Sequence, residues 1–470
     1  MSATTLATAA ACLGISSKSP EDLPYERFKT LKQKCIKPQN YDAVRASWKR
    51  LLISMSKELD KISGEDYIPQ VNFEDIIANN LQIPPKTVED LKKKGCLIIR
   101  DLIPDKEAIG WKNRILDYFE KHGDITGSPE SGPSNWYVHW SQSQVEARAH
   151  PRMVQLMKAV GDVYSNVNSD DPIDMMSQVV YADRVRVRSP GKQVTLNLHA
   201  DSSSIERWED DGYRDVYREI FEGNWEQWDP YVINKRLLSI QDLYEGVSAN
   251  GSTCSVFRSF QGWLALSDAK SGEGTIRFLP DLKHVIPYIL LRPFFWNDIT
   301  DEIDVTSTKF PGATPGSGQF MAYDEGLFPH LKHNKSVVGI ADVKPGDFVL
   351  WHADLLHEVD KEHNGAEDSS VMFIAHTPLC EYNIQTLLNS RDAFLNGLKP
   401  KDFVYELKYG PDESLYEDRG KQENILSDEG LMALGLKKFN VDEENITSGQ
   451  KKIRKLANSI LFPEKEQKRN

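Results

Sequence analysis

Cysteine is scarce in this sequence, which has five widely spaced cysteines in 470 residues and no Cys-X-X-Cys pair. That pattern excludes a disulfide framework and a cysteine-rich zinc module, and a reducing, cytoplasmic compartment is the simpler expectation. No apolar run reaches the roughly 20 residues of a membrane span. Residues 1–23 lack the arginines of a mitochondrial presequence and the basic start of a secretory signal, so we expect a flexible tail there.

Positive charge is also in deficit, because 57 Lys and Arg face 70 Asp and Glu and give a formal net charge of −13. Non-specific binding to nucleic acid or to an anionic membrane needs a surplus of basic residues. We therefore expect no nucleic-acid or membrane partner and predict a small-molecule substrate instead. A local basic pocket for an acidic co-substrate is compatible with this charge.

Helical patterns occupy both ends of the chain. In YDAVRASWKRLLISMSKELDKI the apolar residues recur three and four apart, and we expect residues 24–175 to form a helical region that covers the core. Within that region GCLIIRDLIP predicts one buried strand. Residues 384–470 are polar, charged and again helical in pattern, so this extension either packs outside the core or mediates a homodimer.

Residues 176–383 differ in character, with about nine short runs rich in Val, Ile, Leu and Phe separated by Gly and Pro. Short strands without regularly alternating helices indicate a sandwich or jelly roll. We predict a mainly β fold, in which a double-stranded β-helix (jelly roll, cupin-like) core is flanked by N- and C-terminal helices. Two insertions interrupt the core: residues 202–235, expected to be partly helical, and residues 281–335, expected to be an irregular lid or wall.

The segment LNLHAD carries the strongest chemical signal. Side chains alternate along a strand, so His199 and Asp201 share one face. An imidazole and a carboxylate side by side suit two ligands of an octahedral metal, and one more imidazole completes a facial triad with three open positions. The simpler alternative is a hydrogen-bonded core histidine followed by an aspartate in a turn.

The third ligand is expected on a later strand, in VKPGDFVLWHADLLHEV. His357 follows a turn and a strand there, whereas His352 lies on the strand itself and competes for the role. Weaker candidates are His376, His330 and His333.

These motifs resemble a known group of enzymes. The order HAD, GWLALSDAKSGEGTIRFLPDLKH and KPGDFVLWHADLLHEV is similar to the phytanoyl-CoA dioxygenase-like branch of Fe(II)/2-oxoglutarate oxygenases. GCLIIRDLIPDKEAIGWKNRILDYF, WSQSQVEARAHPRM and GDFVLWHADLLHEV more closely resemble the Domain of Unknown Function 1479 family of fungi and bacteria. In that pattern the second histidine occupies the Leu-Leu-His position, which favours His357 over His352.

The resemblance implies a non-haem Fe(II)/2-oxoglutarate-dependent dioxygenase. His199, Asp201 and His357 would hold the iron, and 2-oxoglutarate and O2 would be consumed to give succinate, CO2 and usually a hydroxylated small molecule. The ligand set alone does not decide between iron and manganese.

One expected residue is missing. The related oxygenases carry an Arg about ten residues after the distal histidine for the far carboxylate of 2-oxoglutarate, because the planar guanidinium matches a carboxylate. This sequence has Ser369 and Ser370 there. The other candidates for this contact are Arg277, Arg258, Arg188, Arg186 and Lys192. Arg186 and Arg188 share a strand face, which fits either a basic patch or a solvated edge strand.

Two further functions fit the same residues. A cupin-like metalloenzyme that does not use 2-oxoglutarate would account for the missing Arg. A non-catalytic jelly-roll scaffold that binds a ligand or a partner is the other, although it has no physical need for three converging metal ligands.

Overall fold

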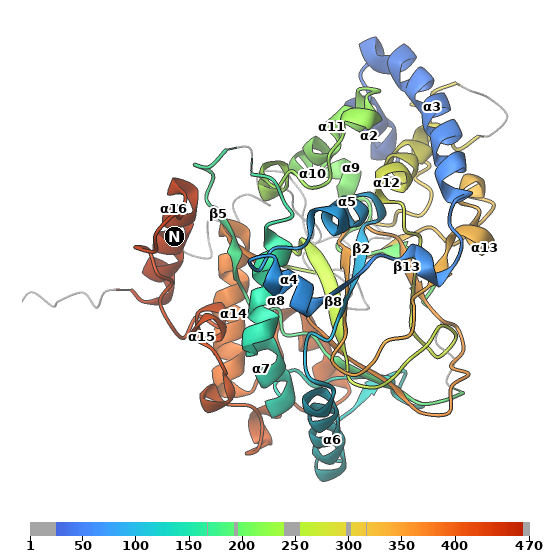
Figure 1. Cartoon of the computed structure of the whole chain (residues 1–470). Coiled ribbons are helices and arrows are strands. Elements are labelled where there is room, and N and C mark those ends of the chain that lie inside the picture. The colour runs from blue at the N-terminus through green and yellow to red at the C-terminus, as the bar shows by residue number, and fades with distance from the viewer. Residues whose placement is uncertain are drawn as a thin grey trace, which may run out of the picture.

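The computed structural model describes residues 25–166, 168–191, 196–238, 254–297, 302–315 and 317–463. These residues form a mixed helical and sheet protein whose sheets are mostly antiparallel (Figure 1). The prediction of a β core with helices at both ends is therefore confirmed in this coarser form. The expected tail and Lys192 lie outside the described residues. In the described part of the chain no helix is long and apolar enough to cross a membrane.

The N-terminal helices follow the periodicity of the sequence. They are α2 (Arg27–Cys35), α3 (Tyr41–Leu59), α4 (Phe73–Ala78), α5 (Pro85–Lys94), α6 (Asp105–Lys121), α7 (Gln142–Ala149) and α8 (Pro151–Gly161). Along α3, Val44, Trp48, Leu51 and Met55 are spaced four, three and four apart and are all buried, because this spacing gathers them on one helix face.

The larger sheet contains eight strands in the order β1-β2-β12-β8-β14-β6-β4-β3. Their bounds are β1 (Gln70–Asn72), β2 (Cys96–Arg100), β3 (Gly127–Ser128), β4 (Asn135–Trp136), β6 (Val185–Arg188), β8 (Phe260–Ala265), β12 (Phe348–His352) and β14 (Ser369–Phe373). The N-terminal region supplies four of these strands. It therefore extends the sheet at both edges, whereas we expected it mainly to cover the core.

The smaller sheet contains five strands in the order β10-β7-β13-β9-β11. Their bounds are β7 (His199–Ala200), β9 (Ile276–Phe278), β10 (Phe320–Met321), β11 (Val338–Gly339) and β13 (His357–Val359). The chain passes repeatedly between the sheets: β6, β8, β12 and β14 belong to the larger one, and β7, β9, β11 and β13 to the smaller. A further pair consists of β5 (Ile173–Gln178) and β15 (Pro378–Cys380).

The two insertions differ from each other. The first insertion contains the short helices α9 (Glu206–Glu209), α10 (Asp211–Val216) and α11 (Arg218–Phe221). It is therefore partly helical, as we expected. The second was expected to be irregular but begins with α12 (Leu282–Leu291), every described residue of which is buried except Lys283. A helix that is apolar all round shows no amphipathic period, and Pro287 inside it also argued against a helix. That prediction was wrong for this segment.

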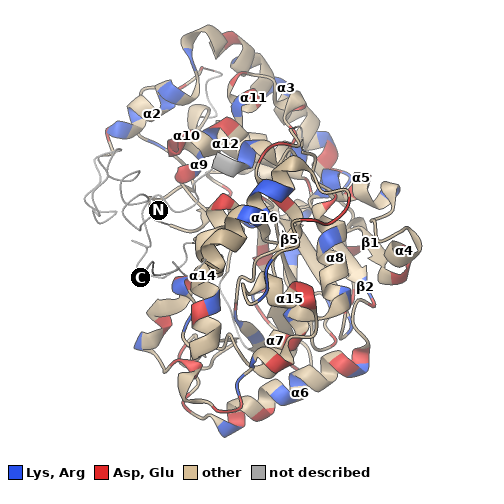
Figure 2. Cartoon of the chain, turned by 90° about the vertical axis from the view of Figure 1, so that its left-hand side faces the viewer, with Lys and Arg blue, Asp and Glu red and all other residues tan. Residues whose placement is uncertain are grey.

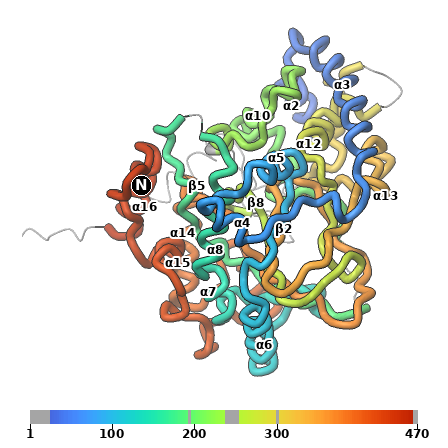
Figure 3. The backbone as a smooth tube through the Cα atoms, viewed as in Figure 1, coloured from blue at the N-terminus to red at the C-terminus, as the bar shows by residue number. Residues whose placement is uncertain are grey.

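The C-terminal extension contains α14 (Glu381–Asn396), the 3₁₀ helix η8 (Lys401–Lys408), α15 (Asp428–Ala433) and α16 (Ser448–Leu461). Helices α15 and α16 pack against β5, on the side of the molecule away from α3 and α12 (Figure 3). Basic and acidic side chains both occur along α6 and α14, whereas the charged residues of α16 are all basic (Figure 2).

Candidate metal centre

The structure brings His199, Asp201 and His357 together, with one ligand atom from each within 4.8 Å of the others. His199 and His357 are paired directly across β7 and β13. Their Nε2 atoms lie 3.4 Å from Asp201 Oδ1 and Oδ2 respectively. Both histidines are almost fully buried, while Asp201 follows β7 and remains partly accessible.

The orientation of each imidazole is fixed by a local hydrogen bond. His199 Nδ1 lies 2.7 Å from the carbonyl oxygen of Asn197, and His357 Nδ1 lies 3.0 Å from that of Leu355. A carbonyl can only accept, so Nδ1 of each ring carries a hydrogen, and Nε2 is left as the atom that can bind a metal. This is the arrangement that metal-binding histidines adopt.

Two glutamines orient the carboxylate of Asp201. Gln319 Nε2 donates to Oδ1 at 3.0 Å. With its amide turned to satisfy both neighbours, Gln261 donates to Oδ2 at 2.9 Å and accepts from Trp351 Nε1 at 3.3 Å. Burial raises the pKa of Asp201, but the two imidazoles outweigh burial and hold the pKa well below its ordinary value. The carboxylate is therefore ionised, as a metal ligand must be.

A buried cluster of ion pairs connects the segment after β7, which carries Asp201, with the loop between β12 and β13. Asp354, between β12 and β13, accepts from Arg207 Nη1 at 2.7 Å and from Arg236 Nη2 at 2.6 Å. Arg207 Nη2 also donates to the backbone carbonyl of Asp201 at 2.9 Å. Sequence reasoning missed this cluster, because no spacing rule relates residue 207 to residue 354. Ser202, next to Asp201, has a φ of 78°, a backbone strain that is common at functional sites.

The competing histidines have other neighbours. His352 is fully buried against the rings of Tyr164 and Tyr231, and burial, followed by the charge of Arg236, lowers its pKa to about 3. The remaining candidates bond elsewhere: His376 to Ser259, His330 to Tyr288 and His333 to Glu358. The structure thus places His357, and none of these four, beside His199 and Asp201.

The three ligands line a cavity of about 220 Å³ between the two sheets. Trp263 and Trp351 also line it. Four arginines complete its polar wall: Arg184, Arg186, Arg188 and Arg258.

Arg186 and Arg188 point into the cavity from β6. This strand lies between β14 and β4, so the alternative of a solvated edge strand is excluded. Arg188 donates to the carbonyls of Asp360 and Lys361. Arg186 is 7% exposed and donates to the carbonyl of Gly274 at 3.2 Å. Burial, followed by the charge of Arg188, lowers its pKa to about 10.

The other two described candidates differ. Arg258 is buried and lines the cavity close to Asp201, donating to Ser202 Oγ at 3.2 Å. Arg277 is about one-third exposed, forms an ion pair of 2.5 Å with Glu358 and is not among the cavity-lining residues. Because Arg277 is paired with Glu358, it does not contribute to the wall of the cavity.

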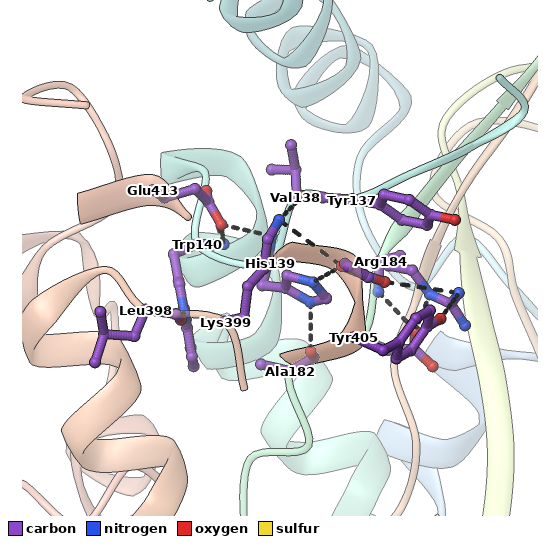
Figure 4. Close-up of polar contacts among 12 residues, drawn as sticks. Tyr137, Val138, His139, Trp140, Ala182, Arg184, Leu398, Lys399, Tyr405 and Glu413 are labelled. Carbon is purple, nitrogen blue, oxygen red and sulfur yellow. Dashed lines mark hydrogen bonds and ion pairs between the residues drawn. The ribbon is translucent and has the colours of Figure 1, made fainter. Parts of the chain in front are cut away.

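Part of the C-terminal extension closes one wall of the cavity, a role that we had not expected for it. Phe403 of η8 lines the cavity, and the neighbouring Asp402 accepts a hydrogen bond from Tyr181 at 3.1 Å. The segment is anchored by Glu406, which lies 2.8 Å from Nε2 of the buried His139. The backbone amides of His139 and Trp140 donate to Glu413 on the same segment (Figure 4).

Comparison with known proteins yields one matching family model, described as Gig2-like, over residues 21–436. The chain is 41% identical to GlcNAc Inducible Gene 2, GIG2 (DUF1479), from Candida albicans; the match covers 94% of this chain and 96% of that one, with a TM-score of 0.84. It is 30% identical over 360 residues to YbiU of Escherichia coli (strain K12), covering 74% of this chain and 81% of YbiU.

A bacterial structure extends the likeness. A protein of Salmonella typhimurium LT2, provisionally named an oxidoreductase, is 27% identical with a TM-score of 0.72, over 88% of this chain and 98% of that one. The resemblance to the Domain of Unknown Function 1479 family, drawn from sequence motifs, is thereby confirmed.

Proposed function

We propose that this chain, which belongs to the Gig2-like family, is an Fe(II)- and 2-oxoglutarate-dependent oxygenase that hydroxylates a small molecule. The observation that carries the proposal is the convergence of His199, Asp201 and His357, with both Nε2 atoms 3.4 Å from the oxygens of the same carboxylate. The resemblance of the surrounding motifs to the phytanoyl-CoA dioxygenase-like branch supports it.

The arrangement of the strands supports a double-stranded β-helix. Strands β6, β8, β12 and β14 lie in one sheet and β7, β9, β11 and β13 in the other; the chain changes sheet at every step among these eight except from β9 to β11, and the pairs formed among them within each sheet are antiparallel. Two facing sheets filled by alternating strands are the plan of a jelly roll. We propose that these eight strands are its core and that the remaining strands extend it.

The donor set fits Fe(II). Two neutral imidazoles and one carboxylate form one face of an octahedron and leave the opposite face open. Iron bound there would supply the positions for 2-oxoglutarate and O2 and the oxidising power for removing hydrogen from a substrate. The chain's own contribution is to fix the two rings through Asn197 and Leu355, to orient Asp201 through Gln261 and Gln319, and to exclude bulk water.

We assign the far carboxylate of 2-oxoglutarate to Arg186. Arg186 lies directly opposite Val371 of β14, the strand on which the resembling oxygenases place their Arg. Residues directly opposite each other in an antiparallel pair share a face, so the Arg186 side chain lies on the same face of the sheet as that of Val371. No carboxylate of the described residues lies within 4.0 Å of it, and its Nε lacks a hydrogen-bond partner. A buried guanidinium without an anion is costly, and a carboxylate relieves that cost.

A second candidate is a metalloenzyme that does not use 2-oxoglutarate. It is favoured by Ser369 and Ser370, which occupy β14 where an Arg is expected. The non-catalytic scaffold is the third possibility, and metal content separates it from both enzymes.

The test is metal content followed by calorimetric titration of 2-oxoglutarate under nitrogen. We expect one Fe(II) per chain in the wild type, almost none in Asp201→Ala and His357→Ala, and wild-type content in the matched control His352→Ala. Arg186→Met should bind iron normally but 2-oxoglutarate about 30-fold more weakly or worse, since removing one partner of a buried charge pair costs about 2 kcal/mol or more. Iron binding without 2-oxoglutarate binding would select the second candidate, and no iron binding would select the scaffold.

A further inference from the structure

We propose that Arg258 forms a second anion subsite beside the metal ligands, which holds an oxyanion group of the primary substrate, a carboxylate or a phosphate. The proposal deepens the proposed function, because it names the class of substrate that the same site takes. Its substrate is a small molecule with an anionic group at one end and a largely apolar body.

Arg258 has the surroundings of an anion-binding residue. It precedes β8, is 8% exposed and lines the cavity. One Nη donates to Ser202 Oγ at 3.2 Å, and the guanidinium lies 5.6 Å from the centre of the Tyr181 ring. Its Nε is buried without a hydrogen-bond partner, and within the described ranges no carboxylate oxygen approaches to 4.0 Å. The side chain is therefore held in place but not neutralised by a close partner.

Two buried arginines that line the cavity, Arg186 and Arg258, have no carboxylate of the described residues within 4.0 Å. Asp201 attracts Arg258 electrostatically, but its carboxylate is already engaged by two histidines and two glutamines. Beyond the end that chelates a metal, 2-oxoglutarate has one free carboxylate, which the proposed function assigns to Arg186. An anion on Arg258 is therefore a second one, and we assign it to the substrate.

The body of this substrate must extend beyond the cavity, which is too small to hold the whole substrate beside the co-substrate. Its volume of about 220 Å³ is below the roughly 300–1,000 Å³ of common small-molecule sites. A second cavity of about 790 Å³ shares Tyr181, Ile374 and Ala375 with it. Tyr181 thus lies in the wall common to both cavities, against Arg258 and held by Asp402.

The larger cavity suits the body of such a substrate. It lies beside α8, β5 and α15, and its apolar part is lined by four methionines, Met153, Met157, Met176 and Met432. Charged side chains line it as well, among them those of Arg148, Lys158, Asp428 and Glu443. Methionine side chains are flexible and polarisable, so they adapt to varied apolar shapes. An anionic head on Arg258 leaves the apolar body to extend past Tyr181 into this space.

The experiment titrates acetate and inorganic phosphate, separately, into protein loaded with Mn(II) and 2-oxoglutarate, and again into the metal-free chain, by calorimetry. We expect the wild type to bind one probe anion per chain, and Arg258→Met to bind it about 30-fold more weakly or worse, since a buried charge loses its partner. Arg258→Lys should be intermediate, because it keeps the charge but loses the planar fork. Arg277→Met, which removes the same charge outside the cavity, should match the wild type.

The outcomes separate this proposal from the proposed function. If Arg258→Met weakens 2-oxoglutarate binding and leaves the probe unaffected, Arg258 is the co-substrate anchor and the proposal is overturned. It is also overturned if neither probe binds the wild type. Failure of the wild type to bind 2-oxoglutarate contradicts the proposed function, whereas probe binding that depends on Arg258 in the metal-free chain supports the subsite by itself. The metal content of each variant shows whether that variant has folded, and the Arg258→Lys variant gives a second, more conservative check.

Discussion

Each ligand histidine is aimed by the carbonyl of the residue two positions before it. His199 uses Asn197 and His357 uses Leu355, so the same local geometry is built twice on two paired strands. Strand alternation in LNLHAD was enough to predict that His199 and Asp201 share a face. The choice of His357 over His352 needed the family pattern, because periodicity favours neither and only the folded chain shows which ring reaches Asp201.

The arginines were the least predictable residues. Sequence reasoning named Arg186 and Arg258 among five candidates, but it could not tell an inward guanidinium from a paired one. Arg277 lies on a core strand, as Arg186 does, and Arg258 lies just before one. The ion pair with Glu358 nevertheless holds Arg277 outside the cavity. Such pairings depend on side chains that are far apart in sequence, and they leave no periodic signal.

Two buried histidines make the free energy of unfolding depend on pH in the acidic range. Burial lowers the pKa of His352 to about 3 and that of His376 to about 4, both below the ordinary value of 6.5. At a pH between the folded and the ordinary pKa values, the unfolded chain therefore binds protons that the folded chain does not bind. Stability from these residues is complete above pH 6.5 and is lost as the pH falls toward the folded values, by up to about 1.4 kcal/mol per pH unit for each histidine.

We predict that His376→Gln flattens this acid dependence. Urea unfolding of wild type and variant, followed by tryptophan fluorescence at pH 7 and pH 5, should show a smaller loss of unfolding free energy for the variant, by about 1–2 kcal/mol across that interval. The glutamine is polar and can still bond Ser259 but takes up no proton. Equal losses in the two proteins would contradict a neutral, buried His376.

At the level of elements, the sequence described two segments least well. Helix α12 was hidden by its uniform apolar composition and by Pro287, and it packs against α3 and α5. The segment containing η8 looked like an exterior addition because it is polar and charged. Its Glu406 is instead buried, and Phe403 lines the cavity, which only the tertiary structure reveals.

The η8 anchor yields a prediction. Glu406 is fully buried, 2.8 Å from His139 Nε2, 3.7 Å from Lys399 Nζ and 3.9 Å from Arg184 Nη1. Glu406→Gln removes the carboxylate that lies within 4.0 Å of both Lys399 and Arg184, and it should cost about 3 kcal/mol of unfolding free energy. Limited proteolysis should also cut the segment around η8 sooner. The control Glu417→Gln changes an exposed residue; a Glu406→Gln protein that behaves like this control would contradict the anchoring role.

At the scale of the whole molecule, the β framework draws on almost the entire chain. Strands β1 and β2 from the N-terminal region pair into the larger sheet beside β12, and η8 from the C-terminal extension walls the cavity. The alternation of apolar runs predicted the mixed character and the ligand strands, since burial on one face imposes that period. It could not predict which distant segments complete the sheet edges, because an edge strand of two or three residues carries too little pattern.

The most direct test of the account follows a visible absorption band. Fe(II) and then 2-oxoglutarate are added without oxygen to the metal-free protein, and the spectrum is searched for the charge-transfer band of a keto acid chelated to iron. The account predicts a band in the wild type and in Arg277→Met, none in His199→Ala, and in Arg186→Met a band that needs about 30-fold more 2-oxoglutarate. Iron that binds at His199, Asp201 and His357 without any band in the wild type would contradict the central claim that this site is a 2-oxoglutarate oxygenase.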